Sequence, residues 1–523
     1  MDAASGYITT PIYYVNGRPH IGHVYTTTIC DVWARFERQL GHDVFFLTGT
    51  DEHGQKVEQS AQDQGLTPQA LADQNAAEFQ GAMSMFGLSN DGFIRTTDAV
   101  HVRQVQAFVK RLMDSGDIYL GTFEGWYDAG QEEYFTETKA REHNYTSPVS
   151  GQPLEKATEE NFYFRLSTYQ ERLEQLFADN PGFVRPDARR NELLGRLRDG
   201  LQDVPISRTN FSWGIPVPGH EEHVIYVWID ALFNYATALG MGEPEGATWA
   251  ARKQYWPPRY HIIGKEILWF HAAIWPALLM ALDVPMPQCI YAHSFWISDG
   301  KKMSKSMGNF IDLERLQACI DTYGRDALRW YLITSGPLGA TDADYTDTQF
   351  HEVYTTDLVN TFGNCASRVS AMIDKYCDGM LPADSTATIA DMDWPAFCAT
   401  QVAASIDAMG RFDLAGACTA AMSIVRRVDA YINETEPFKK AKDPEQADVL
   451  AGILYRCAEA IRIASCLLAA AMPDKIQELH TAWGIAPITD LGSACAWGGL
   501  QTGQSIEKVA LFPRVTVEAP VEG

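Results

Sequence analysis

The sequence predicts an α/β protein whose parallel sheet is interrupted by an antiparallel insertion and followed by an all-α bundle. Three observations support this prediction. Short β-forming runs alternate with helical stretches before about residue 118 and again from about residue 226. The intervening segment is rich in Tyr, Phe, Glu, Thr, Gly and Pro. Beyond about residue 350, apolar residues recur at helical spacing, with no strand pattern until the last few residues.

The chain opens with a strand, a loop and a helix. Tyr7–Tyr14 alternates β-forming residues, and Asn16-Gly17 is a turn signal. Apolar residues within Val24–Leu40 repeat at helical spacing until Gly41 ends the pattern. A second apolar run, Val44–Thr48, leads into a polar loop, and three helical stretches follow. This alternation predicts parallel strands whose two faces are covered by helices.

The second half of the chain again alternates apolar runs with helical stretches. The α/β pattern resumes at Val224–Ile229 and Tyr260–Ile263, where each apolar run leads into a helix. Another run, Cys289–Trp296, ends in a polar loop at Ser298–Asn309. The helical spacing of the last third covers four stretches, 353–378, 396–410, 412–433 and 445–472.

Composition excludes several classes of protein. The 523 residues provide material for about three to four domains. They are 46% hydrophobic and 21% charged, which excludes collagen-like, low-complexity and wholly disordered chains. The net charge of −25 excludes a protein that coats nucleic acid non-specifically, although a local basic surface can still hold one nucleic-acid partner.

Membrane, secretion and metal signals are weak or absent in the sequence. No run reaches the about 18–20 apolar residues of a membrane span, and the N-terminus lacks a targeting signal. We therefore expect a cytoplasmic protein with no membrane partner. The ten cysteines are too sparse for a disulfide scaffold, and none forms a Cys-x-x-Cys pair. Zinc held by cysteine pairs is therefore not expected.

Two histidines lie where the first loop becomes a helix. His20 and His23 flank Gly22, at a helix N-terminus whose unpaired N–H groups and dipole suit a phosphate. Both histidines can donate hydrogen bonds to a transferring phosphoryl group, and Gly22 lets a flat or anionic ligand approach the backbone. Taken alone, such a pair is more often made of capping or surface residues.

A lysine-rich loop is the second candidate for chemistry. Asp299–Asn309 contains Lys301, Lys302 and Lys305 close to two glycines. A mobile lysine loop can follow negative charge onto a leaving diphosphate, which is an electrostatic role without covalent chemistry. A solvated basic loop is the simpler interpretation of a lysine cluster considered alone.

Together and in this order, His20-Ile21-Gly22-His23 and Lys302-Met303-Ser304-Lys305-Ser306 resemble the two signatures of class I aminoacyl-tRNA synthetases. Thr9–Gly17, Gly41–Val44 and Thr48–Gly54 are similar specifically to methionyl-tRNA synthetases, and the similarity runs through most of the chain. The resemblance implies a Rossmann-type parallel sheet with an inserted connective domain, followed by an all-α anticodon-binding bundle.

The resemblance also implies domain boundaries. They are 1–117 and 226–296 for the two halves of the Rossmann catalytic domain, 118–225 for the connective insertion, 297–349 for the lysine loop and stem-contact region, and 350–523 for the anticodon-binding domain with a short tail.

The implied activity is methionine–tRNA ligase (EC 6.1.1.10). L-Methionine and ATP, with Mg²⁺, would give methionyl-adenylate and diphosphate, and tRNA(Met), initiator or elongator, would then accept the methionyl group as AMP leaves. The resemblance makes His20, His23, Lys302 and Lys305 catalytic. The implied ATP-binding residues are His20, Gly22, His23, Lys302, Ser304 and Lys305.

The methionine pocket implied by the resemblance combines one charge with an apolar wall. Asp51, at the carboxyl end of a strand, would pair with the α-ammonium group. Core packing is the alternative for Trp275, because aromatic stripes at helical spacing are usually core. Leu232 stands where some relatives have proline. The remaining residues of the expected pocket are Ile12, Tyr14, Trp228, Ala231, Leu232, Tyr235, Ile267, His271 and Trp275.

The resemblance also implies an anticodon-reading face. Asn360, Asn364 and Arg368 fall at i, i+4 and i+8 of a helix, and Asn and Arg side chains hydrogen-bond base edges bidentately. Unstacked RNA bases also pack on aromatic side chains. Phe438 stands where relatives often have tryptophan, so it can stack but lacks the indole N–H. A solvated helix side is the alternative for this face.

The resemblance also leads us to expectations about structural zinc and about the oligomeric state. Many methionyl enzymes carry zinc knuckles of four cysteines in the insertion, whereas residues 31–288 here contain no cysteine. We therefore expect the zinc-free form, with no structural zinc. The tail from Lys508 is shorter than the extra domain that dimerises some relatives, so we expect a monomer.

Two other functions stay open at this point. One is a catalytically idle tRNA-binding or regulatory paralogue, against which the intact signatures count. The other is a non-tRNA nucleotidyltransferase that shares the His-x-Gly-His site. Such enzymes generally lack a helical bundle like that of residues 350–510.

Overall fold

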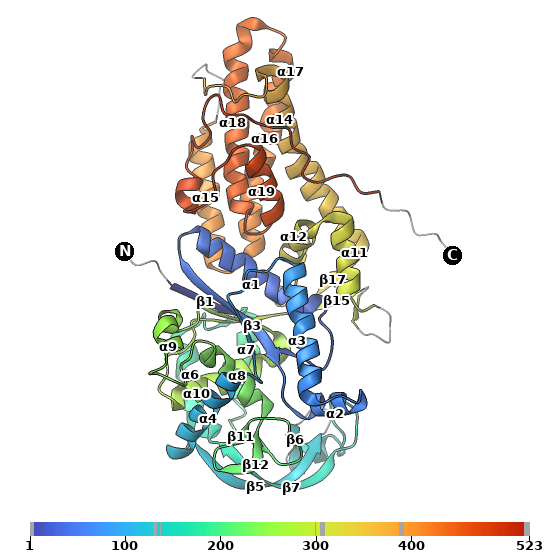
Figure 1. The fold of residues 1–523 in the computed structure, drawn as a ribbon, viewed down its shortest axis with the longest axis vertical. Coiled ribbons are helices and arrows are strands. Elements are labelled where there is room, and N and C mark those ends of the chain that lie inside the picture. Colours follow the sequence, from blue (N-terminus) through green and yellow to red (C-terminus); the bar gives the residue numbers. More distant parts are fainter. Residues whose placement is uncertain are drawn as a thin grey trace, which may run out of the picture.

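The computed structural model describes residues 5–128, 133–135, 137–298, 300–303, 309–385 and 392–516. A parallel sheet with helices around it forms the middle of the molecule, an antiparallel insertion lies at one end, and a long helical bundle extends from the other (Figure 1). This arrangement confirms the predicted fold class.

The central sheet is parallel throughout and runs in the order β2-β3-β1-β13-β14-β8, with β4 also paired to β3. Its order changes direction between β1 and β13, which is the point where open α/β sheets bind ligands at the carboxyl ends of their strands. The strands are β1 (Ser5–Thr9), β2 (Tyr13–Tyr14), β3 (Asp43–Asp51), β4 (Gly92–Arg95), β8 (Val184–Arg185), β13 (Tyr260–Gly264) and β14 (Ile290–His293).

Helices cover both faces of the sheet. The first, α1, begins after His20 and ends at Gln39, just before Gly41, whose positive φ of 83° ends the helix where the sequence predicted. The helices of this part are α1 (Ile21–Gln39), α2 (Gln55–Asp63), α3 (Pro68–Met85), α4 (Ala99–Asp114), α8 (Val227–Thr237), α9 (Ala247–Arg252), α10 (Trp275–Ala281), α11 (Leu313–Tyr323) and α12 (Arg325–Ser335).

The insertion is antiparallel, as its composition predicted. One sheet has the order β6-β5-β7-β9 and a second has the order β10-β12-β11. β8, in contrast, comes from within the insertion and pairs with β14 of the central sheet. The elements are β5 (Ile118–Asp128), β6 (Glu133–Phe135), α5 (Glu137–Glu142), β7 (Glu155–Phe164), α6 (Gln170–Asp179), α7 (Asp187–Leu197), β9 (Val204–Pro205), β10 (Ser207–Arg208), β11 (Pro216–Val217) and β12 (His220–Ile225).

The last third is a helical bundle, as predicted. It differs from the expected continuous helix over 353–378, because a ten-residue π-helix, η6 (Tyr354–Gly363), separates two α-helices. The sheet β16-β15-β17 leads to it, with β15 (Trp296–Ser298), β16 (Lys301–Lys302) and β17 (Ala343–Tyr345). The helices are α13 (Asp347–Val353), α14 (Asn364–Cys377), α15 (Trp394–Gly410), α16 (Leu414–Thr435), α17 (Pro437–Lys440), α18 (Ala447–Leu468), α19 (Pro473–Ala482) and α20 (Leu491–Ala494).

One hydrophobic core joins α1 to the bundle. Val24, Trp33 and Phe36 of α1 belong to the same buried cluster as residues of α15, α16 and α18. Within this core Arg329 of α12 bonds to Asp31 of α1 at 2.7 Å, and both side chains are fully buried. Arg329 also donates to two carbonyls that follow α18. A buried charge of this kind is stable only with such partners, so α12 fastens α1 to the bundle.

No helix among the described residues is long and apolar enough to cross a membrane. The ten cysteines are all free thiols.

Asp326 makes stability depend on pH at this junction. Burial raises the pKa of its carboxyl group to about 6, although Lys475 N–H donates to it at 2.7 Å. Between about pH 4 and 6 the folded chain therefore keeps a proton that the unfolded chain has lost, so this group makes folding less favourable as pH rises. We expect Asp326→Asn to gain about 1–2 kcal/mol of stability relative to the parent between pH 5 and pH 7.5. Thermal melts of the two proteins across that range test this, and a difference that does not change with pH would contradict it.

Candidate active site

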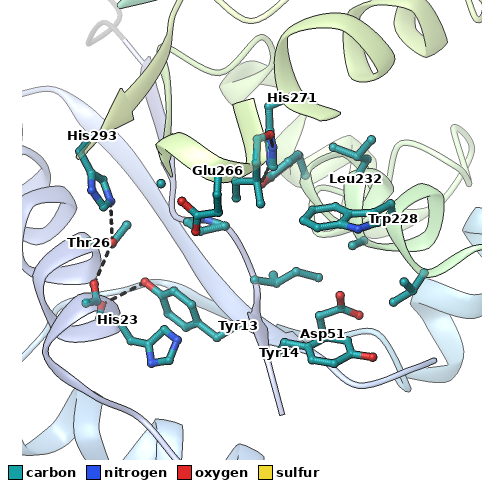
Figure 2. A pocket seen from close by; sticks show the side chains of 18 of the residues that line it. Tyr13, Tyr14, His23, Thr26, Asp51, Trp228, Leu232, Glu266, His271 and His293 are labelled. Atoms are coloured by element: carbon teal, nitrogen blue, oxygen red, sulfur yellow. Dashed lines mark hydrogen bonds between the residues drawn. The ribbon is translucent and has the colours of Figure 1, made fainter. Parts of the chain in front are cut away.

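A cavity of about 390 Å³ opens at the carboxyl ends of β1, β3, β13 and β14. Side chains from the ends of β3 and β14, from α1 and from α8 converge on it (Figure 2). Towards one end lie His23, Thr26 and His293, and towards the other lie Asp51, Trp228 and Leu232. The predicted residues that line it are Ile12, Tyr14, His20, Gly22, His23, Asp51, Trp228, Ala231, Leu232, Tyr235, Ile267 and His271.

The two signature histidines stand at the start of α1, and each carries its ring proton on the same atom, Nε2. His20 is the N-cap, and its Nδ1 accepts from the backbone N–H of Gly22 at 3.1 Å. His23 Nδ1 accepts from the backbone N–H of His20 at 3.2 Å. A ring nitrogen that accepts carries no proton, so each neutral ring has its proton on Nε2. Both rings are therefore set as Nε2–H donors for the oxygens of a phosphoryl group.

Burial keeps the His23 ring neutral. It lowers the pKa of His23 far below the ordinary value, and the neighbouring His20 lowers it further. The two rings lie only 3.9 Å apart between centroids. A Cβ added at Gly22 would come within 2.9 Å of the His20 ring, so only glycine fits between the two histidines.

The negative charge of the cavity lies at the end of β3. Asp51 is the last residue of that strand, pairs in register with Tyr14 of β2, and is 7% exposed. Gly54 follows with a φ of 103°, and a Cβ there would come within 2.8 Å of the Tyr14 hydroxyl. Asp51 is thus a carboxylate at a narrow, partly desolvated point, which suits an ammonium group.

The opposite wall is mainly apolar. It comes from α8 and from the turn that follows β13, where Trp228 stacks on Phe270 with 4.0 Å between ring centroids. The Tyr235 hydroxyl lies 2.7 Å from His271 Nε2, and His271 Nδ1 lies 3.0 Å from the Ile267 carbonyl. Since that carbonyl can only accept, the proton is on Nδ1, and Tyr235 donates to Nε2. Burial lowers the pKa of His271 to about 4.

Trp275 does not line the cavity, although the sequence predicted it there with Ile267 and His271. It is fully buried and donates its indole N–H to His261 Nε2 at 3.3 Å. The reason is a π-helix, η4 (Phe270–Ile274), between the 3₁₀ turn η3 (Lys265–Ile267) and α10. A π-helix closes i→i+5 bonds, so residues four apart no longer share one face.

Some cavity residues were not predicted from the sequence. Glu266 follows β13 and lines the cavity, and burial raises the pKa of its carboxyl group. His293 ends β14, lies 2.8 Å from the Thr26 hydroxyl, and has its pKa lowered to about 4 by burial. Their position at the carboxyl ends of parallel strands is the sequence signal that would have found them. The other unpredicted lining residues are Pro11, Tyr13, Lys56, Val227, Gly264 and Phe295.

The chain that follows the lysine loop lies beside the start of α1. Lys302 is exposed on β16, whereas Ser304 and Lys305 lie outside the described residues. The chain after the loop pairs with the signature segment, because Ile21 N–H donates to the Ile311 carbonyl at 3.1 Å. His20 and Asp312 form a β-bridge at the same place.

The expected anticodon-reading residues lie along the bundle. Asn360 is in η6, and its side-chain oxygen accepts from Arg514 at 3.1 Å. Asn364 begins α14 and is exposed, whereas Arg368 of the same helix pairs with Asp429. Phe438 is 42% exposed on α17. In Figure 1, α14 and α17 lie in the part of the bundle remote from the sheet.

Comparison with known proteins gives consistent matches. Residues 6–370 match the family described as tRNA synthetases class I (M). A methionine–tRNA ligase of Streptomyces coelicolor is 43% identical over 98% of this chain and 97% of its own length. One from Halalkalibacterium halodurans is 41% identical over 98% of this chain and 79% of its own.

Solved structures agree with this. The methionyl-tRNA synthetase of Mycobacterium tuberculosis in complex with methionyl-adenylate superposes with a TM-score of 0.89 at 35% identity, covering 98% of this chain and all of its own. Its free state superposes with a TM-score of 0.84 at 32% identity, covering 99% of each chain.

Proposed function

The chain belongs to the class I methionyl-tRNA synthetases, the methionine–tRNA ligases, and from this premise we propose how its cavity forms methionyl-adenylate and passes methionine to tRNA(Met). One observation carries the proposal. A single cavity joins the Nε2–H donors of His20 and His23 to the Asp51 carboxylate and a largely apolar wall. These are the partners that a phosphoryl group, an ammonium group and a thioether side chain require.

In the first step, the α-ammonium of L-methionine pairs with Asp51, and its side chain packs against the α8 wall. The carboxylate oxygen attacks the α-phosphorus of Mg²⁺-bound ATP, and the bond to the bridging oxygen of the β-phosphate breaks. His20 and His23 donate to the phosphoryl oxygens as their charge grows, and fixed donors aimed at developing charge usually make the largest single contribution to catalysis. Lys302 and Lys305 neutralise the diphosphate that leaves.

In the second step, the 2′-hydroxyl of the terminal tRNA adenosine attacks the carbonyl carbon of the adenylate. The bond from that carbon to the phosphate oxygen breaks, and AMP leaves with its phosphate accepting the proton that the hydroxyl loses. Burial keeps the His23 and His271 rings neutral, so neither presents an imidazolium that would compete with the α-ammonium group for Asp51.

Amino-acid-dependent ATP–diphosphate exchange, measured for all twenty amino acids without tRNA, tests the function. We expect exchange with methionine alone. Exchange with another amino acid would keep the reaction class but overturn the pocket assignment. Folded protein that binds tRNA yet shows no exchange would instead be an idle paralogue. The same preparation should scatter light as a monomer, and we propose the cytoplasm, where tRNA and ATP are supplied, as its location.

We propose that Asn360, Asn364, Arg368 and Phe438 read the anticodon of tRNA(Met). Phe438 is an exposed aromatic ring, and stacking on one base contributes about 1–3 kcal/mol. We expect Phe438→Ala to weaken tRNA(Met) binding about tenfold while methionine-dependent diphosphate exchange stays within twofold. Phe438→Trp should bind at least as tightly as the parent. Unchanged tRNA binding in the alanine variant would remove Phe438 from the interface.

We propose that the insertion needs no zinc. Trp126 and Tyr145 both donate to Glu137, at 2.7 and 2.9 Å, and hold the tip of the insertion together. Beneath them Phe135, Ala140 and Leu154 form a small apolar cluster. Among the residues described, no three His, Cys, Asp or Glu side chains are grouped to hold a metal ion. We expect less than about 0.1 zinc per chain by elemental analysis and full activity after chelation; stoichiometric zinc would contradict this.

A further inference from the structure

A buried carboxylate behind the cavity connects its two walls. Asp230 lies on α8, on the face opposite Trp228 and Tyr235, and is fully buried. His53 Nδ1 lies 2.7 Å from one of its oxygens, and His101 Nε2 of α4 lies 2.7 Å from the other. A carboxylate buried this completely has to be hydrogen-bonded, and these two imidazoles supply its hydrogen bonds.

The two histidines come from different elements, His53 from the loop after β3 and His101 from α4. His53 stands two residues after Asp51, in the loop that carries the charged wall. His101 reaches α8 a second time, because its Nδ1 lies 2.7 Å from the Thr237 hydroxyl at the far end of that helix. The helix that presents the apolar wall is therefore bonded on its back to the loop that presents Asp51.

The backbone next to His53 is fixed by hydrogen bonds to the insertion and by close contact with the start of α8. Gly54 N–H donates to the Trp213 carbonyl at 2.9 Å, and the Trp213 indole donates to the Glu52 carbonyl at 2.6 Å. A Cβ at Gly54 would lie 3.6 Å from Val227 Cβ, the first residue of α8. His53 is thus held from the insertion side as well as by Asp230.

We propose that Asp230, with His53 and His101, sets the separation between Asp51 and the apolar wall of α8, and so positions methionine for adenylation. Asp230 touches no substrate and is a positioning residue. This inference rests on the proposed function of the cavity and adds to it the residues that fix the width of the amino-acid end. Loss of the link should weaken methionine binding while ATP binding, which depends on the α1 end, stays unchanged.

The test uses substitutions at His53 in the full chain. His53→Leu removes the donor, whereas the side-chain nitrogen of His53→Asn superposes on Nδ1 and keeps it. His480→Leu is the matched control, since His480 is buried in the bundle and bonded to Ser465 at 2.8 Å, remote from the cavity. Each variant is measured by calorimetric titration with L-methionine, by diphosphate exchange and by thermal melting.

We expect His53→Leu to raise the Kd and KM for methionine about tenfold, with KM for ATP within twofold and kcat within threefold. His53→Asn should keep both methionine constants within threefold. His480→Leu should lower the melting temperature and leave them unchanged. Asp230→Leu should reproduce His53→Leu wherever it folds.

Three results would overturn the inference. They are an unchanged methionine Kd in His53→Leu, an equal rise in KM for methionine and for ATP, or a failure of His53→Asn to restore binding. The parent protein separates this inference from the proposed function. A parent that exchanges diphosphate with methionine while His53→Leu binds methionine normally loses only the positioning role. A parent that neither binds methionine nor exchanges loses both.

Discussion

His20→Asn should slow methionyl-adenylate formation by about 10²–10³-fold, whereas His20→Gln should lose less than about tenfold. The reason is the proton arrangement at the start of α1. His20 uses Nδ1 to accept from Gly22, which leaves the proton on Nε2. Glutamine can present an amide N–H near the place of Nε2. Asparagine is shorter and presents its polar atoms near Nδ1 only.

His20→Asn keeps the start of α1 intact, because asparagine is a preferred N-cap residue. Its effect on the rate therefore reports the loss of the Nε2–H donor rather than the loss of the cap. Pre-steady-state diphosphate exchange with saturating methionine and ATP measures the step, and melting temperatures confirm that both variants are folded. Equal losses in the two variants would show that His20 acts through the fold of the loop rather than through Nε2–H.

Asp51→Asn should raise KM for methionine about 100-fold, equivalent to roughly 3 kcal/mol, with a much smaller change in KM for ATP. Asp51 is 7% exposed, so its partner exchanges water for a short charge-assisted bond that a neutral amide cannot replace. Methionine titrations in the diphosphate exchange assay measure this directly.

Glu52→Gln is the matched control for Asp51. Glu52 is the next residue and fully buried, but its carboxylate bonds to Arg95 at 2.7 and 2.9 Å instead of lining the cavity. It should cost stability and leave KM for methionine within twofold. A methionine analogue without the amino group should bind the parent and Asp51→Asn equally. A clear preference for the parent would mean that Asp51 does not hold the ammonium group.

The predicted and observed folds agree where the signal is local. The helix that Gly41 ends and the last three apolar stretches of the bundle follow from the spacing of neighbouring residues. Tyr7–Tyr14, predicted as one strand, is instead divided into β1 and β2, which pair with opposite sides of β3. Pro11, which has no N–H to donate, stands between them. β8 has only two residues, so its pairing with the central sheet depends on a long-range contact that no local pattern encodes. The two π-helices, η4 and η6, differ from α-helices by one residue in the hydrogen-bond register, which apolar spacing does not reveal.

The same division explains the site. His20, His23 and Asp51 were predictable because their motifs are continuous in the sequence. The apolar runs of β13 and β14 mark Glu266 and His293 as strand-end residues, but placing both strand ends at one cavity requires the strand order. The resemblance placed Trp275 in the pocket, whereas after η4 it is fully buried in the core, which was the alternative. The role of Lys305, outside the described residues, stays a prediction.

The core shared by α1 and the bundle has a consequence for how this protein can be cut and recombined. Val24, Trp33 and Phe36 of α1 belong to one buried core with residues of the bundle helices, and Arg329 keeps a buried charge paired only while Asp31 is present. Catalytic part and bundle should therefore melt as one cooperative unit in a calorimeter. A bundle taken from a relative would have to include α12 and match the α1 of this chain. The bundle can therefore not be exchanged on its own.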